Sequence, residues 1–100
     1  MIRLVPVPFE GGVALGVEVQ LPKTTLLAIA TDVGYIMCGA LDVALLNERL
    51  ADRGIVAGRA VGVRTLEELM EAPLESVTHA AAKRGIRPGM RGADALKLMA

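Results

Sequence analysis

The feature that most constrains the fold is a strict alternation of residue types between positions 13 and 21. Aliphatic residues alternate there with small or polar ones: Val13, Leu15, Val17, Val19 and Leu21 with Ala14, Gly16, Glu18 and Gln20. A period of two predicts a β-strand that buries its aliphatic face. The two glycines before it predict a turn, so residues 2–7 should form the hairpin partner. Pro6 and Pro8 cannot donate ladder hydrogen bonds, which predicts an edge position for that partner.

Two further strands are expected next, followed by a helix. The apolar segments 25–31 and 35–38 predict the third and fourth strands, separated by a tight turn. Asp42 is suited to cap a helix whose apolar residues recur at helical spacing: Val43, Leu46 and Leu50. Gly54 favours the end of that helix. Residues 55–63 predict a fifth strand, and this strand–helix–strand order indicates a right-handed crossover between two parallel strands.

The C-terminal part of the chain predicts short helices. Thr65 and Glu68 match a capping box, which predicts a helix through about Met70. A second helix, closed by Gly85, is predicted by apolar residues at helical spacing: Leu74, Val77 and Ala81. Residues 94–99 predict a last helical turn or two.

Together these elements predict one α+β domain with two layers over residues 1–100. Its mixed, mainly antiparallel sheet should have about five strands, with one crossover helix and two or three C-terminal helices. Residues 1–40 are the strand-rich half and residues 41–100 are the helix-rich half.

Composition excludes several classes of function. Hydrophobic residues make up 53% of the chain but include one Phe, one Tyr and no Trp, so the core must be aliphatic. So many aliphatic residues in a small chain favour burial against identical copies. Eleven basic residues balance eleven acidic ones, which argues against a nucleic-acid partner. One Cys and one His exclude an internal disulfide and predict no metal site.

The chain also lacks the patterns of export and membrane insertion. Its first residues do not have a signal-peptide layout. The longest nearly apolar stretch, residues 33–46, is too short to span a bilayer and carries Asp42. A soluble cytoplasmic protein without a membrane partner is therefore expected.

Charge is placed unevenly along the chain. An acidic cluster comprises Glu67, Glu68, Glu71 and Glu75. A basic cluster follows: Lys83, Arg84, Arg87, Arg91 and Lys97. We expect two solvated faces that pair with each other within or between subunits.

Chemistry-bearing residues are densest just before the predicted crossover helix. Cys38 lies at a strand-to-helix corner, where a helix N-terminus favours a thiolate nucleophile; the alternative is a small buried hydrophobe. His79 could act as its base, although no local signature links the two. Gly39 permits a sharp corner, and Asp42 could serve as a helix cap or as a general base.

Two arginines and a tyrosine are candidate ligand-binding residues. Arg59 lies mid-strand among apolar residues, so it either pairs with a carboxylate or binds an anion in a cavity. Arg64 follows the fifth strand and is expected at the same sheet edge as the helix N-terminus. The hydroxyl of Tyr35 could orient a ligand, or the ring could anchor packing.

Several segments resemble the YunC-like family of bacterial and archaeal proteins. They are Gly34-Tyr35-Ile36-Met37-Cys38-Gly39-Ala40-Leu41-Asp42, Gly54-Ile55-Val56-Ala57-Gly58-Arg59-Ala60-Val61-Gly62-Val63-Arg64-Thr65, Leu21-Pro22-Lys23 and Ala72-Pro73-Leu74-Glu75-Ser76-Val77-Thr78. The resemblance implies a domain of unknown function that forms tetramers through its N-terminal β-region. It implies no reaction, cofactor or catalytic set.

The leading functional hypothesis is a small oligomeric protein that binds an anionic metabolite near Gly39, Asp42 and Arg64. A thiol-dependent enzyme is the alternative, with Cys38 as nucleophile and Asp42 or His79 assisting. A third possibility is a structural oligomer that recruits a protein partner. The sequence leaves open whether the protein is an enzyme and which cofactor, if any, it uses.

Overall fold

The computed structural model describes residues 1–39, 43–48 and 53–100. Six strands form one sheet whose order follows the chain: β1 (Ile2–Phe9), β2 (Gly12–Leu21), β3 (Thr24–Ala30), β4 (Gly34–Met37), β5 (Val56–Arg59) and β6 (Ser76–Val77). The helices are α1 (Val43–Glu48), α2 (Leu66–Glu71), α3 (His79–Lys83) and α4 (Gly92–Lys97). The β4–β5 pair is parallel and the other pairs are antiparallel, so the predicted α+β fold is confirmed, with one strand more than expected.

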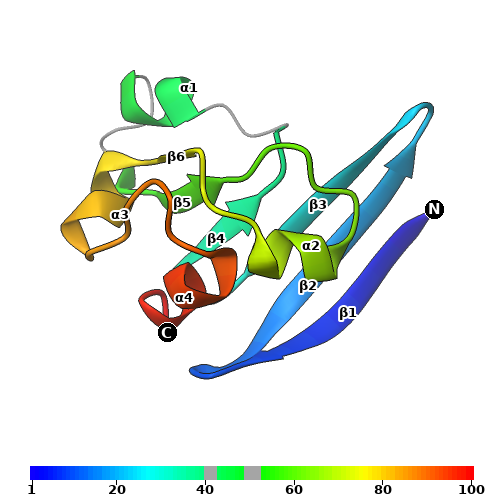
Figure 1. Cartoon of the computed structure of the whole chain (residues 1–100), viewed down its shortest axis with the longest axis horizontal. Helices are drawn as coiled ribbons and strands as arrows, with labels where there is room; N and C mark the ends of the chain where they lie inside the picture. Colours follow the sequence, from blue (N-terminus) through cyan, green and yellow to red (C-terminus); the bar gives the residue numbers. More distant parts are fainter. Residues whose placement is uncertain (40–42, 49–52) are drawn as a thin grey trace.

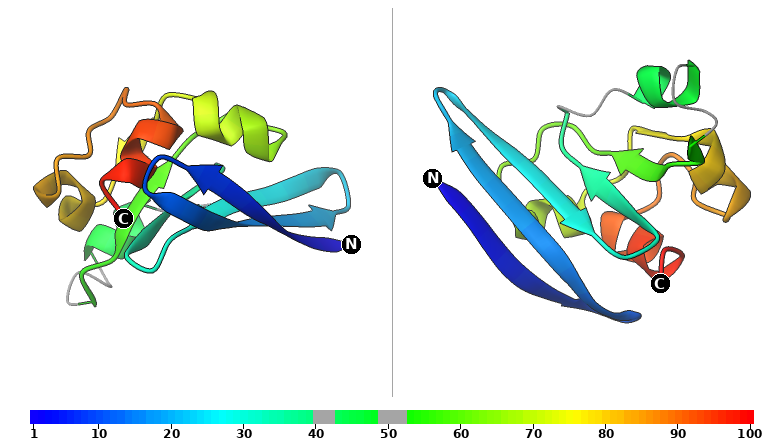
Figure 2. Two further views of the ribbon diagram at one scale, coloured as in Figure 1. Left: turned by 90° about the horizontal axis from the view of Figure 1, so that it is seen from below. Right: turned by 180° about the vertical axis from the view of Figure 1, so that it is seen from behind.

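Helices cover the two faces of the sheet unequally (Figures 1 and 2). α2 and α4 pack over one face, which we call the inner face, whereas α1 lies on the other side beside β5. Among the described residues, the inner-face core contains eight large side chains that are fully buried: Leu27, Ile29, Ile36, Leu69, Leu74, Ile86, Leu96 and Met99. No described helix is long and apolar enough to cross a membrane.

The burial of β2 is the reverse of the prediction. Its buried residues are the small ones, Ala14 and Gly16, while Val13 is 69% exposed and Leu15 is 46% exposed. The reason is the approach of α2, because a Cβ on Gly16 would lie 2.9 Å from Cδ1 of Leu66. The small side chains admit the helix, and the aliphatic ones point to the opposite side of the sheet.

The second C-terminal helix was predicted wrongly over its first residues. Residues 76 and 77 form β6 against β5, and α3 begins at His79. Thr78 is buried and caps α3, since its Oγ1 accepts a hydrogen bond from the N–H of Ala81 at 3.2 Å. The same hydroxyl accepts from the N–H of Ala57 at 3.1 Å and donates to the carbonyl of Ile55 at 2.7 Å. Pairing with β5 therefore outweighs the local helical pattern.

The crossover between β4 and β5 is confirmed, although β5 is shorter than the predicted strand. A Cβ on Gly34 would collide with the carbonyl of Val56, so the two strands approach closely only with glycine there. Gly62 has φ +76°, a left-handed conformation that turns the chain away from the sheet toward α2. Within α1, Leu46 is buried as expected, whereas Asp42 and Leu50 lie outside the described residues.

Candidate functional site

Cys38 is a core residue. Its side chain belongs to the inner-face core and is 7% exposed, and its Sγ accepts a hydrogen bond from the N–H of Leu27 at 3.4 Å. His79 is exposed at the start of α3, where its backbone N–H donates to Oδ1 of Asn47 at 2.9 Å. Within the described residues, no hydrogen bond joins Cys38 to His79. Of the two alternatives for Cys38, the geometry thus matches the small buried hydrophobe and not the thiolate nucleophile.

Arg59 and Gly39 are in direct contact. The carbonyl of Gly39 accepts from Nε of Arg59 at 3.3 Å and from Nη2 at 3.2 Å. Nη1 of Arg59 forms an ion pair with Oε1 of Glu75 at 2.9 Å. A hydrogen bond from the hydroxyl of Ser76, together with Arg59, holds the pKa of Glu75 below the ordinary range. Arg59 is therefore paired with a carboxylate, which was one of the two alternatives considered for it. The partner, Glu75, is in the same chain.

Arg64 lies beside a polar hollow. Its backbone N–H donates to Oε1 of Glu68 at 2.7 Å, and the N–H of Glu68 donates to Oγ1 of Thr65 at 3.0 Å, which confirms the capped start of α2. The hollow has a volume of about 580 Å³ and lies between the β2–β3 turn and the segment before α2. Its lining residues are Gln20, Leu21, Lys23, Thr24, Thr25, Val63 and Arg64.

This hollow brings Arg64 together with donors that sequence reasoning missed, namely Lys23, Thr24 and Thr25. Lys23 and Arg64 form no ion pair with any described residue, and they face the same space as the hydroxyl-bearing Thr24 and Thr25. Lys23 has φ +64°, in the left-handed region that few non-glycine residues adopt. Two cations and two hydroxyl groups can together bind a small oxyanion. The signal in the sequence that pointed to this hollow was Leu21-Pro22-Lys23, one of the segments that resemble the family.

Tyr35 and Arg64, two of the predicted ligand-binding residues, line different hollows of the described structure. Tyr35 lines a separate hollow of about 310 Å³ with Arg53, at the end of β4 opposite to Gly39. Asp42 lies outside the described residues. Gly39 and Arg59 contact each other, while Arg64 lies at the polar hollow. Within the described part of the chain, no group of His, Cys, Asp or Glu side chains is arranged to bind a metal ion.

The face of the N-terminal sheet opposite to α2 and α4 is apolar, and no described helix covers it. Strand register places twelve aliphatic or proline residues on it, which we call the outer face: Ile2, Leu4, Pro6, Pro8, Val13, Leu15, Val17, Val19, Leu21, Leu26, Ala28 and Ala30. The register places Thr24 on the same face, which therefore has no charged residue in β1, β2 or β3. Ile2 is 70% exposed and Leu4 is 64% exposed.

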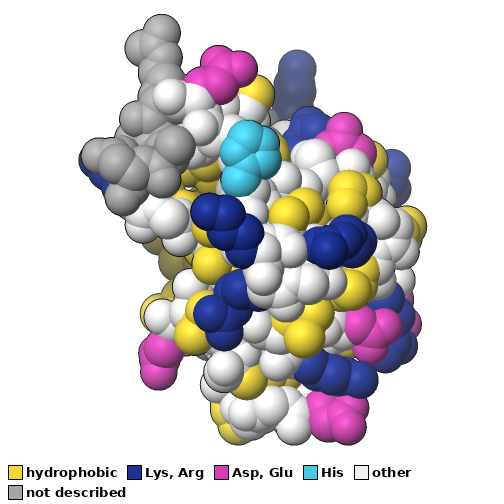
Figure 3. Space-filling model, turned by 90° about the vertical axis from the view of Figure 1, so that its left-hand side faces the viewer, with side chains coloured by type: hydrophobic (Ala, Val, Ile, Leu, Met, Phe, Trp, Pro, Cys, Tyr) yellow, Lys and Arg dark blue, Asp and Glu magenta, His cyan; other side chains and the backbone are white. Residues whose placement is uncertain are grey.

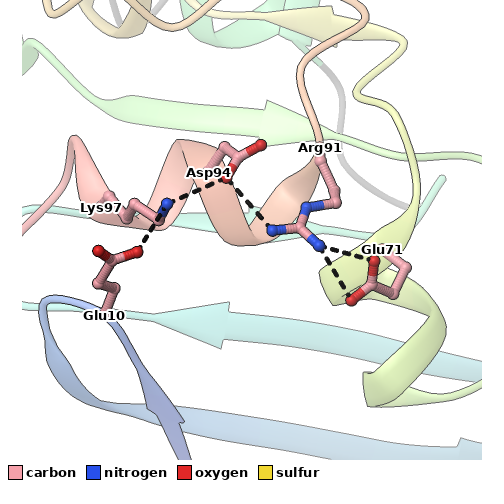
Figure 4. A network of polar contacts seen from close by, with 5 residues as sticks. All are labelled: Glu10, Glu71, Arg91, Asp94 and Lys97. Atoms are coloured by element: carbon pink, nitrogen blue, oxygen red, sulfur yellow. Dashed lines mark hydrogen bonds and ion pairs between the residues drawn. The ribbon is translucent and has the colours of Figure 1, made fainter.

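Ion pairs tie the inner-face helices to their surroundings (Figure 4). Lys97 on α4 bridges Glu10 in the β1–β2 turn at 2.8 Å and Asp94 at 3.3 Å. Arg91 bridges Asp94 at 3.4 Å and Glu71 on α2 at 3.0 Å. These contacts hold the pKa values of Arg91 and Lys97 above the ordinary ranges and that of Asp94 below. Part of the basic cluster thus pairs with acidic residues of the same chain, as expected.

Comparisons with known proteins confirm the resemblance seen in the sequence. The model of a family described as a domain of unknown function (DUF1805) matches residues 37–99. The uncharacterized protein YunC of Bacillus subtilis (strain 168) is 62% identical over 99 residues, covering 99% of this chain and 98% of that protein. The crystal structure of a protein of unknown function from Thermoplasma acidophilum has a TM-score of 0.89 and 28% sequence identity, covering 100% of this chain and 94% of that one. The chain therefore belongs to the YunC-like family, defined by the DUF1805 domain, whose function is unknown.

Proposed function

We propose that this protein is a self-associating domain whose copies pack together through the outer face, and that the assembly binds a small anionic metabolite. The observation that carries the proposal is the outer face itself. Monomeric proteins rarely expose a contiguous apolar surface of this kind, and such surfaces mark sites of association. We expect four copies, the number that the family resemblance implies.

Packing between faces is favoured over pairing between strand edges. Residues of an antiparallel strand alternately direct their N–H and C=O groups toward the partner strand and away from it. The N–H of Gln20 donates to the carbonyl of Met1, so the odd-numbered residues of β1 bond to β2 and the even-numbered ones point outward. Pro6 and Pro8 therefore interrupt the free edge, which argues against its pairing with another strand.

The test is the mass of the protein in solution. Leu15→Glu places a charge on the outer face, so we expect a monomer by sedimentation equilibrium where the wild type is an oligomer. Val61→Glu is the matched control, because Val61 is 49% exposed and lies outside the outer face. Circular dichroism checks that both variants are folded. A monomeric wild type, or equal loss of assembly in both variants, would contradict the proposal.

A specific observation supports the anionic ligand. Lys23 and Arg64 line one polar hollow without a carboxylate partner among the described residues. Gly39, in contrast, presents a carbonyl oxygen to Arg59. A carbonyl oxygen carries partial negative charge, so it is unsuited to bind an anion. We therefore centre the proposed site on Arg64 and Lys23.

Thermal denaturation in added inorganic phosphate tests this site. We expect the wild type to gain stability beyond the effect of an equal ionic strength of chloride. Lys23→Asn should abolish that gain, and asparagine tolerates the left-handed backbone at this position. Arg53→Gln removes a charge outside the hollow and serves as the control. A gain that survives Lys23→Asn would refute the site.

The thiol-dependent enzyme is supported less well. A nucleophilic thiol must reach its substrate, whereas Cys38 is enclosed by the inner-face core.

A further inference from the structure

The segment between Glu75 and Asp94 carries positive charge with no acidic residue in it. Its sequence from 76 to 93 contains one histidine, one lysine and three arginines. Arg91 pairs with Glu71 and Asp94. The other cations, Lys83, Arg84 and Arg87, lie at the end of α3 and in the turn after it, and we call them the basic face. Figure 3 looks onto this side of the molecule, where Lys and Arg side chains gather.

The basic face has no counter-charge within the described chain. All three residues are exposed, and none forms an ion pair with a described residue. The chain has equal numbers of acidic and basic residues, so this local excess is not a consequence of overall charge. Three neighbouring cations repel one another, and an acidic partner would relieve that repulsion.

Both guanidinium groups are oriented by backbone carbonyls. Nε of Arg84 donates to the carbonyl of Leu98 at 2.9 Å. Nη1 of Arg87 donates to the carbonyl of Ala82 at 2.7 Å and to that of Ile86 at 3.2 Å. Each contact uses only part of a guanidinium that carries five N–H donors, so further donors remain for a ligand. A fixed guanidinium loses less conformational entropy when it binds a carboxylate.

The basic face also remains accessible in the proposed assembly. α3 packs beside β5, whereas the outer face belongs to β1, β2 and β3 at the other end of the sheet. Association through the outer face would therefore present one basic face for each copy. Repetition of a weak site in an oligomer raises the overall affinity for a partner that carries several acidic segments.

We propose that the basic face is a docking surface for an acidic segment of a partner protein, rich in Asp or Glu. Carboxylates match the planar donor geometry of arginine, which favours such a segment. A nucleic-acid strand is disfavoured, because single-strand binding sites combine cations with aromatic platforms. The aromatic residues, Phe9 in β1 and Tyr35 in β4, belong to other parts of the fold.

The test is titration of the full-length protein into a fluorescein-labelled peptide of six glutamates, at low and at physiological ionic strength. We expect saturable, salt-sensitive binding that an equivalent glutamine peptide lacks. Lys83→Gln combined with Arg87→Gln should weaken binding by roughly two- to twentyfold. The double variant Arg53→Gln with Arg3→Gln removes the same charge from elsewhere, outside the basic face and the polar hollow, and should bind as the wild type does.

Three results would overturn the proposal. The first is no binding of the glutamate peptide by the wild type at low ionic strength. The second is equal weakening by both double variants, which would show an effect of net charge alone. The third is tighter binding of an oligothymidine of matched charge, which would indicate a nucleic-acid surface instead. Arg87 also donates hydrogen bonds to backbone carbonyls at the end of α3. The single variant Lys83→Gln is therefore measured as well, because it removes a charge and leaves those hydrogen bonds in place.

Discussion

The two faces of the N-terminal sheet differ in a way that the hydrophobic pattern does not predict. The inner face of β2 carries small residues and is covered by helices of the same chain, whereas the outer face carries the large aliphatic residues and has no described helix over it. Small residues bury because a helix can approach them closely, and not because they are strongly hydrophobic. The comparison teaches that alternation identifies a strand and its two faces, while the covering layer depends on which elements fold back over it.

The largest expected contrast between the faces is in chemical reactivity. Cys38 is an inner-face core residue and should react with iodoacetamide only when the structure opens. A cysteine introduced on the outer face, by Leu15→Cys with Cys38→Ser, should react roughly a thousandfold faster in dilute protein. Intact mass spectrometry over time measures both rates.

The same reagent sharpens the comparison when protein concentration is raised. The rate at position 15 should fall as copies associate through the outer face, while the rate at Cys38 should not change. Fast alkylation of Cys38 in the native protein would contradict the closed inner face and would bring the thiol-dependent enzyme forward.

Truncation of a leucine should affect the two faces differently. Leu27→Ala removes a fully buried side chain and should cost about 2–5 kcal/mol in the free energy of unfolding. Leu15→Ala should cost less than about 1 kcal/mol in the dissociated protein, because that side chain is already half exposed. Urea denaturation at several protein concentrations separates folding from association. Equal costs in dilute protein would mean that the two faces are equally buried within one chain.

Enlarging a small inner-face residue should also destabilise the fold. Gly16→Val would place atoms against Val7 and Leu66, whose side chains lie 2.8 and 2.9 Å from a Cβ at this position. Overpacking of this kind costs about 1–3 kcal/mol. The control is Val17→Ile, which adds one methylene group to the adjacent outer-face position and should have little effect on thermal stability in dilute protein. A neutral Gly16→Val would show that α2 can shift away without cost.

The smallest expected effect concerns an exposed charge pair outside both apolar faces. Hydrogen bonds from Ser76 and Arg59 lower the pKa of Glu75. Its contribution to stability is therefore present above the unfolded-state pKa, and it is lost as the pH falls through the lowered folded-state value. In urea denaturation, the wild type should lose part of its free energy of unfolding as the pH falls below about 4.3. Glu75→Gln should not show this part of the loss.

Glu67→Gln is the control for this measurement, since Glu67 accepts no hydrogen bond from a described side chain and forms no described ion pair. If Glu75→Gln and Glu67→Gln alter the pH dependence equally, the pair with Arg59 does not contribute measurably.

The candidate sites were only partly accessible to sequence reasoning. Arg59 was correctly recognised as a charge in an apolar strand, but its partner Glu75 is sixteen residues away and could not be chosen from sequence alone. The structure sets Arg64 across a hollow from Lys23, a neighbour from a hairpin turn far earlier in the chain that the sequence did not indicate. Contacts between distant segments depend on the path of the whole chain.

Local patterns by themselves determined the strands of the hairpin, the edge position of β1, the crossover between β4 and β5, and the capped start of α2. Each depends on backbone geometry within a few residues, such as the alternation of a strand, the missing N–H of proline or the reach of a capping side chain. Tertiary structure alone decided which face of β2 is buried, that residues 76 and 77 form a strand, and which cations lack a partner. Hydrophobic attraction has no direction. A hydrophobic pattern therefore predicts that a face of the sheet will be covered, and the tertiary structure decides which element covers it.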